Sequence, residues 1–186
     1  MKIIRVLFAA VLISTLSGCV SLLAPNYSPD YEAIDKLKKL NLQKISLGEF
    51  QPRDPNAAVN KISLRGASLK AQEGAFSIYL ENAIQSDLKE IGILDSSSNT
   101  KLDATLLKND IDISGLIKGS GIMEVKLTIS KNGKQTFDKT YSTTTNFDSS
   151  FAGAIAVGIG QKEYPSLVRA FLKEIYNDPE FTRAVQ

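Results

Sequence analysis

One thiol stands out among the side chains of this sequence that could do chemistry. Cys19 is the only cysteine in 186 residues, and Leu16, Ser17 and Gly18 come directly before it. Lys2 and Arg5 precede an uncharged stretch, residues 6–16, which is too short to cross a ~30 Å hydrocarbon core as a helix. The pattern predicts an export signal that ends at Cys19. It also makes the Cys19 sulfur a candidate lipid attachment point.

The residues Leu16, Ser17, Gly18 and Cys19 match all four positions of the lipobox, so the N-terminus resembles that of bacterial lipoproteins. The resemblance implies cleavage by signal peptidase II between Gly18 and Cys19. It further implies a diacylglycerol on the sulfur and a fatty acid such as palmitate on the new amino group. One acyl chain holds a protein weakly, whereas three hold it firmly. The alternative is an ordinary secretory signal that leaves Cys19 as a free thiol in an oxidising compartment.

The residue after the cysteine is Val20. In enteric lipoproteins an aspartate at this place favours retention in the inner membrane. The resemblance therefore implies an address at the periplasmic face of the outer membrane.

Residue types that are missing exclude several kinds of enzyme. The chain contains no histidine, which supplies most acid–base catalysis near neutral pH and most metal ligands. Triads, cysteine–histidine dyads, ordinary zinc sites and haem ligation are therefore excluded. Only carboxylate, lysine or tyrosine chemistry remains, and we expect no catalytic residue, no metal and no cofactor.

Two partial motifs are better explained by ordinary structure. Residues 110–115 match the first half of a calcium loop, but its twelfth position is Gly121 in place of a glutamate. Residues 158–160 resemble a dinucleotide-binding turn, but the third glycine of that pattern would fall at Glu163. We expect a strand at the first motif. The small-residue stretch 152–160 predicts either close packing under a sheet or a patch that faces a membrane or partner.

A few polar side chains in the expected sheet could also form a groove at one of its ends: Lys108, Asn109, Tyr141 and Thr143 to Thr145. Ordinary strand positions are the alternative. Asn109 shares the phase of the apolar residues, so it needs hydrogen-bond partners if it is buried. We expect it to bind backbone near a bulge.

Charge argues against nucleic acid as a partner. Removal of residues 1–18 takes away Lys2 and Arg5 and leaves 20 basic and 20 acidic residues. A neutral surface lacks the positive charge that phosphate backbones require. The predicted organisation is a signal peptide (1–18), a lipidated N-terminus and tether (19–28), and a single periplasmic domain (29–186).

The first half of this domain predicts a short helix, two strands and a long helix. Ser28, Pro29 and Asp30 indicate the start of a helix over 29–40. Alternating apolar residues predict strands over 43–50 and 60–65. Apolar residues at three- and four-residue spacing predict a helix over 74–91, which ends in a Schellman motif at Gly92.

The second half predicts a meander of strands followed by helices. The strand over 101–114 changes its apolar phase, so a bulge is expected near Leu106 and Leu107. The next expected strands are 121–130 and 134–147. A two-residue turn at Asn132 and Gly133 would place Phe137 on the wrong face, so we expect a three-residue loop, 131–133, that pairs Leu127 with Phe137 and Met123 with Tyr141. Helices are expected to begin at Pro165 and Pro179.

These elements predict an α+β fold. It is a two-layer sandwich of a mainly antiparallel four- to five-stranded sheet, one long central helix and C-terminal helices. The chain resembles small proteobacterial outer-membrane lipoproteins of the YajG type, and more distantly the lipopolysaccharide-assembly lipoproteins. The resemblance is carried by residues 107–111, 149–155 and 164–181. These families supply no catalytic residues to carry over.

The function predicted from the sequence is that of a non-catalytic envelope lipoprotein, an interaction or accessory domain held near the membrane by Cys19. A tether of about eight residues would let the domain move ~25 Å from the lipid. A carrier or assembly factor that binds lipid or lipopolysaccharide between helix and sheet is the alternative. An enzyme is the third possibility, with catalytic carboxylates that the sequence alone does not pair. The membrane and an envelope protein or lipid are the expected partners.

Overall fold

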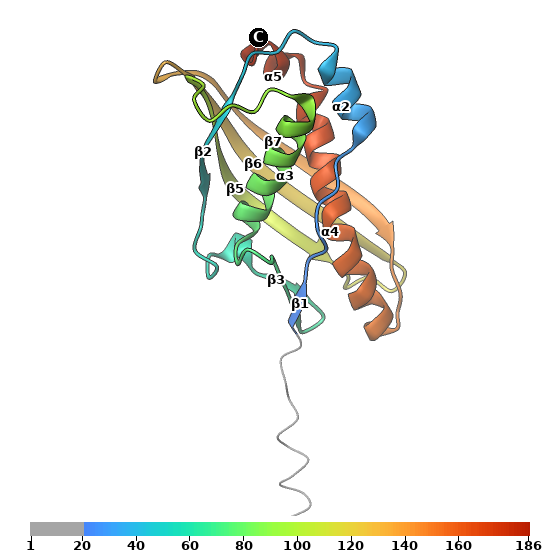
Figure 1. Cartoon of the computed structure of the whole chain (residues 1–186). Coiled ribbons are helices and arrows are strands. Elements are labelled where there is room, and N and C mark those ends of the chain that lie inside the picture. The colour runs from blue at the N-terminus through green and yellow to red at the C-terminus, as the bar shows by residue number, and fades with distance from the viewer. Residues whose placement is uncertain (1–20) are drawn as a thin grey trace, which may run out of the picture.

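Two sheets and two long helices form the domain in the computed structural model, which describes residues 21–186 (Figure 1). The main sheet has the strand order β2-β5-β6-β7, and the small sheet has the order β1-β4-β3. The strands are β1 (Ser21–Leu23), β2 (Ser46–Gln51), β3 (Ile62–Leu64), β4 (Ala67–Lys70), β5 (Thr100–Asp112), β6 (Lys118–Lys131) and β7 (Lys134–Asp148). The helices are α2 (Tyr31–Lys38), the short 3-10 helix η1 (Ala58–Asn60), α3 (Phe76–Ile91), α4 (Gly153–Tyr176) and α5 (Pro179–Ala184).

The predicted α+β class and mainly antiparallel sheet are confirmed. β5 to β7 form an antiparallel meander, and β2 joins its edge in parallel with β5. α3 and α4 cover one face of this sheet (Figure 1). The core lies between the two layers, where Phe50, Phe76, Tyr164 and Phe171 are fully buried. The small sheet, with its strands β1 and β4, was not predicted.

Two of the helix ends follow the sequence signals. Gly92 has a left-handed φ of 84° and the N–H of Ile93 donates to the Leu88 carbonyl, which is the predicted Schellman stop. α5 begins at Pro179 as expected, and the Asp178 side chain caps it. The first helix starts later than predicted, because its cap is the Asp30 side chain and not Ser28. α3 takes its cap from a distant residue, since Asn60 Oδ1 accepts from the N–H groups of Phe76 and Ser77.

The predicted bulge in β5 is confirmed at Leu107. Leu106 pairs with Val125 and Lys108 with Glu124, so Leu107 is the extra residue. The bulge moves the buried phase from even to odd positions.

The predicted hairpin loop after β6 is wrong. Asn132 and Gly133 alone form the turn, with φ of 52° and 77°, and Lys131 pairs with Lys134. An extra residue, Thr136, then restores the apolar phase, so that Ile129 pairs with Phe137 and Val125 with Tyr141. The Thr136 hydroxyl donates to the Ile129 carbonyl and holds this bulge. The error arose because an extra residue inside the strand changes which face the following side chains occupy, just as an extra loop residue would.

The predicted helix start at Pro165 is also wrong, because α4 begins twelve residues earlier at Gly153 and contains Pro165. Ala156, Gly160 and Tyr164 are buried at four-residue spacing and continue the stripe of Val168 and Leu172. The first positions of this stripe are small residues, which give little apolar signal in a sequence. A Cβ on Gly160 would lie 2.9 Å from Ile113 Cγ2, so the glycine lets α4 lie close against β5.

Candidate membrane-attachment site

The residues predicted to carry the lipid, Leu16, Ser17, Gly18 and Cys19, lie outside the residues that the structure describes. The first described residue, Ser21, follows Cys19 by two positions. The structure therefore shows the segment that closely follows the predicted attachment residue. We call residues 21–30 the N-terminal strap.

The strap is folded into the domain, which differs from the predicted tether. Ser21 to Leu23 form β1, which pairs in parallel with β4, and Ser21 lies opposite Ser68. The N–H of Ala24 continues the pairing with a 2.8 Å bond to the Lys70 carbonyl, and Ala24 is fully buried. Leu22 packs partly against the core. A three-residue strand is too short to leave a clear alternating pattern in a sequence, so the segment was assigned to a linker.

Side chains from the two long helices fasten the strap further. The Tyr79 hydroxyl of α3 donates to the Pro25 carbonyl at 2.8 Å. Gln161 of α4 donates to the Leu23 carbonyl at the same distance. The strap is therefore bound to β4 and to both long helices.

A buried carboxyl group provides the last of the contacts that hold the strap. Asp87 of α3 is 1% exposed, and its Oδ2 accepts hydrogen bonds from Tyr27 at 2.8 Å and Tyr176 at 2.9 Å. Its Oδ1 has no hydrogen-bond partner within residues 21–186. Burial raises the pKa of Asp87 to about 6, against the lowering effect of the two hydroxyls. Burial and the nearby carboxylate likewise raise the pKa of Tyr27.

Asp87 was missed in the sequence, although a signal was present. It lies on the apolar face of its helix, among Leu80, Ala83, Ile84 and Leu88, where a charged residue is unusual. Its shifted pKa alone is typical of catalytic carboxyls. However, the two groups that hydrogen-bond to Asp87 are the phenols of Tyr27 and Tyr176, which join the strap and α4 to α3, and this arrangement is that of a structural clamp.

The other predicted polar residues have separate partners and do not form one groove. Asn109 is buried, and its amide donates to the Val59 carbonyl before β3 and not to backbone at the bulge. The Tyr141 hydroxyl donates to Asp178 at 2.5 Å, and Thr143 donates to Glu174. Although burial opposes ionisation, bonds from Lys139 and Tyr141 lower the pKa of Asp178 to about 2. This cluster joins β7 to α4 and α5.

The two partial motifs occupy regular structure. Asp110 and Asp112 belong to β5, and Asp112 accepts from the Ser114 N–H at 2.8 Å. No group of three acidic, histidine or cysteine side chains comes together in the described part of the chain. Gly158 and Gly160 lie inside α4 and not in a turn.

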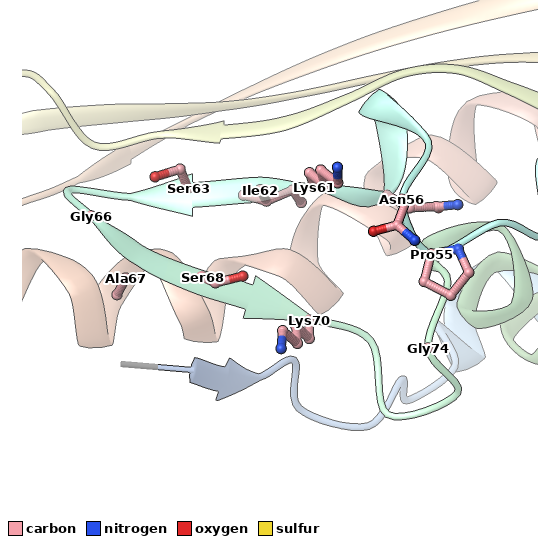
Figure 2. A pocket seen from close by; sticks show the side chains of 11 residues that line it. Pro55, Asn56, Lys61, Ile62, Ser63, Gly66, Ala67, Ser68, Lys70 and Gly74 are labelled. Atoms are coloured by element: carbon pink, nitrogen blue, oxygen red, sulfur yellow. The ribbon is translucent and has the colours of Figure 1, made fainter. Parts of the chain in front are cut away.

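An open hollow of about 440 Å³ lies on the outer face of the small sheet (Figure 2). Ser63 and Ser68 line it together with Lys61 and Lys70, and Pro55 and Gly74 close one end. None of the described residues that line it is acidic. The hollow therefore lacks the carboxylate that a carboxylate–lysine acid–base pair would need.

Comparisons with known proteins define the fold. No family model and no curated protein matches the chain. The solved structures include protein XCC0632 of Xanthomonas campestris, from the DUF330 family, with a TM-score of 0.54 and 13% identity over 83% of this chain and 92% of that one. This likeness shows a shared fold.

Two further solved structures have lower scores. A protein of Caulobacter crescentus CB15 that is considered a lipoprotein has a TM-score of 0.40 and 11% identity, over 78% of this chain and 93% of its own. A minor lipoprotein of Acinetobacter baumannii has a TM-score of 0.42 and 17% identity, over 78% and 92%. Within residues 21–186, none of the helices has the length and apolar character needed to cross a bilayer.

Proposed function

We propose that this chain is a lipid-anchored envelope lipoprotein that acts without catalysis, as an interaction or accessory domain at the periplasmic face of the outer membrane. The match of Leu16 to Cys19 to the lipobox supports the anchor. The address follows from Val20, which replaces the aspartate associated with inner-membrane retention.

The observation that carries this proposal is that the chain is already part of a sheet at Ser21. Cleavage before Cys19 would leave Ser21 as the third residue of the mature chain, and Ser21 already pairs with Ser68. Regular structure is therefore already present two residues after the predicted lipidation site. At up to ~3.6 Å per residue, about 7 Å of chain separates the Cys19 and Ser21 Cα atoms, so the lipid would attach almost directly to the domain.

The interior supports an interaction role over carriage of a lipid. The space between helices and sheet, where a carrier would hold an acyl chain, is occupied by aromatic rings. Phe76 and Tyr79 pack on Tyr164 with ring centroids 4.5 Å and 5.1 Å apart. Tyr164 itself is fully buried.

The proposal is tested by intact-mass analysis of protein from its native membranes. We expect a chain that begins at Cys19 and carries one diacylglyceryl group and one further acyl chain. A second sample carries Cys19→Ala behind a signal cut by the ordinary signal peptidase, so that no uncut signal remains as an anchor. This variant should leave the membrane fraction in a carbonate wash.

A bare Cys19 sulfur in the native protein would contradict the proposal, as would a washed variant that stays with the membrane. Val20→Asp is the control for the address. In an enteric host it should keep the lipid and move the protein to the inner membrane.

A further inference from the structure

Four exposed apolar side chains lie at the end of the domain where the strap begins. Leu116 and Ile117 are 73% and 67% exposed in the loop between β5 and β6. Phe151 is 78% exposed just before α4, and Ile155 is 59% exposed in its first turn. Half of the eight large apolar residues exposed in the described chain therefore belong to these two neighbouring segments.

Arg65 fixes these segments to the small sheet. Its guanidinium donates to the carbonyls of Ile113 at 2.9 Å, Gly115 at 3.0 Å and Phe151 at 3.1 Å. The N–H of Ser149 also donates to the Ile117 carbonyl at 2.9 Å. The four apolar side chains are thus held on one rigid end of the domain, which we call the apolar end.

The strap starts beside the apolar end. Arg65 and Gly66 form the turn between β3 and β4, since Leu64 pairs with Ala67. The next residue of β4, Ser68, pairs with Ser21. Figure 1 shows the start of β1 and the start of α4 at the same end of the molecule. Cys19 is two residues before Ser21, so the chain leaves the described structure toward its lipid at this end.

We propose that the apolar end, formed by Leu116, Ile117, Phe151 and Ile155, docks into the headgroup–acyl boundary of the leaflet that holds the Cys19 lipid. This proposal rests on the proposed lipidation. A short link of about 7 Å leaves no room for the domain to stand away from the bilayer. Exposed leucine, isoleucine and phenylalanine side chains gain free energy when they enter that boundary. The lipid and the apolar end together give the domain one orientation.

The absence of tryptophan from the chain allows a direct test. Phe151→Trp and Ile117→Trp each introduce one emitting ring at the apolar end, and Leu40→Trp is the matched control. Leu40 is 41% exposed and follows α2, near Gln43, whose N–H donates to the Val185 carbonyl beside α5. Each full-length lipidated variant is reconstituted into phosphatidylethanolamine–phosphatidylglycerol vesicles that contain brominated phospholipid.

The rings at 117 and 151 should lose about half of their emission, because an apolar side chain at this boundary lies ~5–10 Å deep, close to the bromine atoms. The ring at position 40 should keep its emission. Equal emission at positions 40 and 151 in protein that has entered the vesicles would overturn the inference. So would shielding of Trp at position 151 that rises with protein concentration and not with brominated lipid, because a second copy would then cover the surface.

A second measurement separates docking from simple nearness to the anchor. Leu116→Gln with Ile117→Gln, added to the Phe151→Trp protein, should restore much of the lost emission although Cys19 still carries its lipid. Unchanged quenching would contradict docking by the apolar end. If the chain were not lipidated at all, mass analysis would show a bare Cys19, and that result is distinct from both outcomes.

Discussion

Asp87 shows how one side chain can hold a chain terminus in place. Its carboxyl group accepts from Tyr27 of the strap and Tyr176 of α4, so three segments that are distant in sequence meet at one oxygen atom. Hydrogen bonds to a buried charged acceptor contribute about 1.5–3 kcal/mol each, but burial of the charge opposes this gain. The raised pKa of Asp87 reflects that balance.

Stability should therefore depend on pH through Asp87. Its pKa is 3.8 in an ordinary environment and about 6 in the folded protein, so the folded state binds the proton more tightly. The contribution of Asp87 is fully present below the ordinary pKa and is lost as the pH rises to about 6. Asp87→Asn should remove this fall in the free energy of unfolding, because an amide does not ionise.

Urea unfolding followed by circular dichroism, on both sides of this pH window, measures the difference between wild type and variant. Asp178 has a lowered pKa, so its own contribution is lost as the pH falls toward about 2 and has the opposite sign. The comparison with Asp87→Asn cancels it. Asp35→Asn, which removes an exposed charge on α2, is the matched control. Parallel pH profiles for wild type and Asp87→Asn would disprove the role of this carboxyl.

At the scale of elements, α4 depends on small residues where it crosses the sheet. Gly160 faces Ile111, Ile113 and Leu64, whereas Gly158, two residues away in the same helix, has nothing within 4 Å of a built Cβ. The two glycines share a backbone conformation and differ in their surroundings. Their substitution therefore separates helix propensity from packing.

Gly160→Ala should lower the free energy of unfolding by about 1 kcal/mol or more, because the new methyl group overpacks the contact with Ile113. Gly158→Ala should raise it by up to ~1 kcal/mol, since alanine favours helix over glycine. Thermal or urea unfolding of both variants measures the pair. Similar gains in both would show that α4 does not rest closely on β5.

Elements with complete local signals could be predicted from the sequence. The Schellman stop at Gly92, the bulge at Leu107 and the cap at Asp178 all follow from residues within a few positions. Features that failed depend on distant partners. The Asn60 cap of α3, the compensating bulge at Thr136 and the continuation of α4 through Pro165 are decided by tertiary contacts. Tertiary packing overrides local propensity in such places.

The candidate site shows the same division. The lipobox is a contiguous motif, so Cys19 could be predicted without a structure. The strap could not, because β1 exists only through pairing with β4, which was itself missed. Of the four residues of the apolar end, only Ile155 belongs to the stretch 152–160 that the sequence analysis singled out. Leu116 and Ile117 lie some forty residues away and reach it through Arg65.

At the scale of the whole molecule, the strap should contribute to stability and not act as a linker. Replacing residues 21–28 by a Gly/Ser stretch should lower the free energy of unfolding by about 3 kcal/mol or more, since β1 pairing, the burial of Ala24 and the Tyr27–Asp87 bond are all lost. Urea unfolding measures the change. The control inserts a Gly/Ser stretch of equal length between Val20 and Ser21 and should leave stability unchanged. Equal stability of the replaced and control proteins would show that residues 21–28 are a simple linker.

The length of α4 gives the anchored molecule a defined height. This helix has 24 residues and begins at the apolar end, and at 1.5 Å per residue it extends about 36 Å. α5 and the C-terminus follow at its opposite end (Figure 1). With one end in the leaflet, the domain would set the distance between the bilayer and its opposite end. A partner that binds near α5 would be kept at a nearly constant distance from the bilayer. A protein on a long flexible tether would instead reach a wide range of distances.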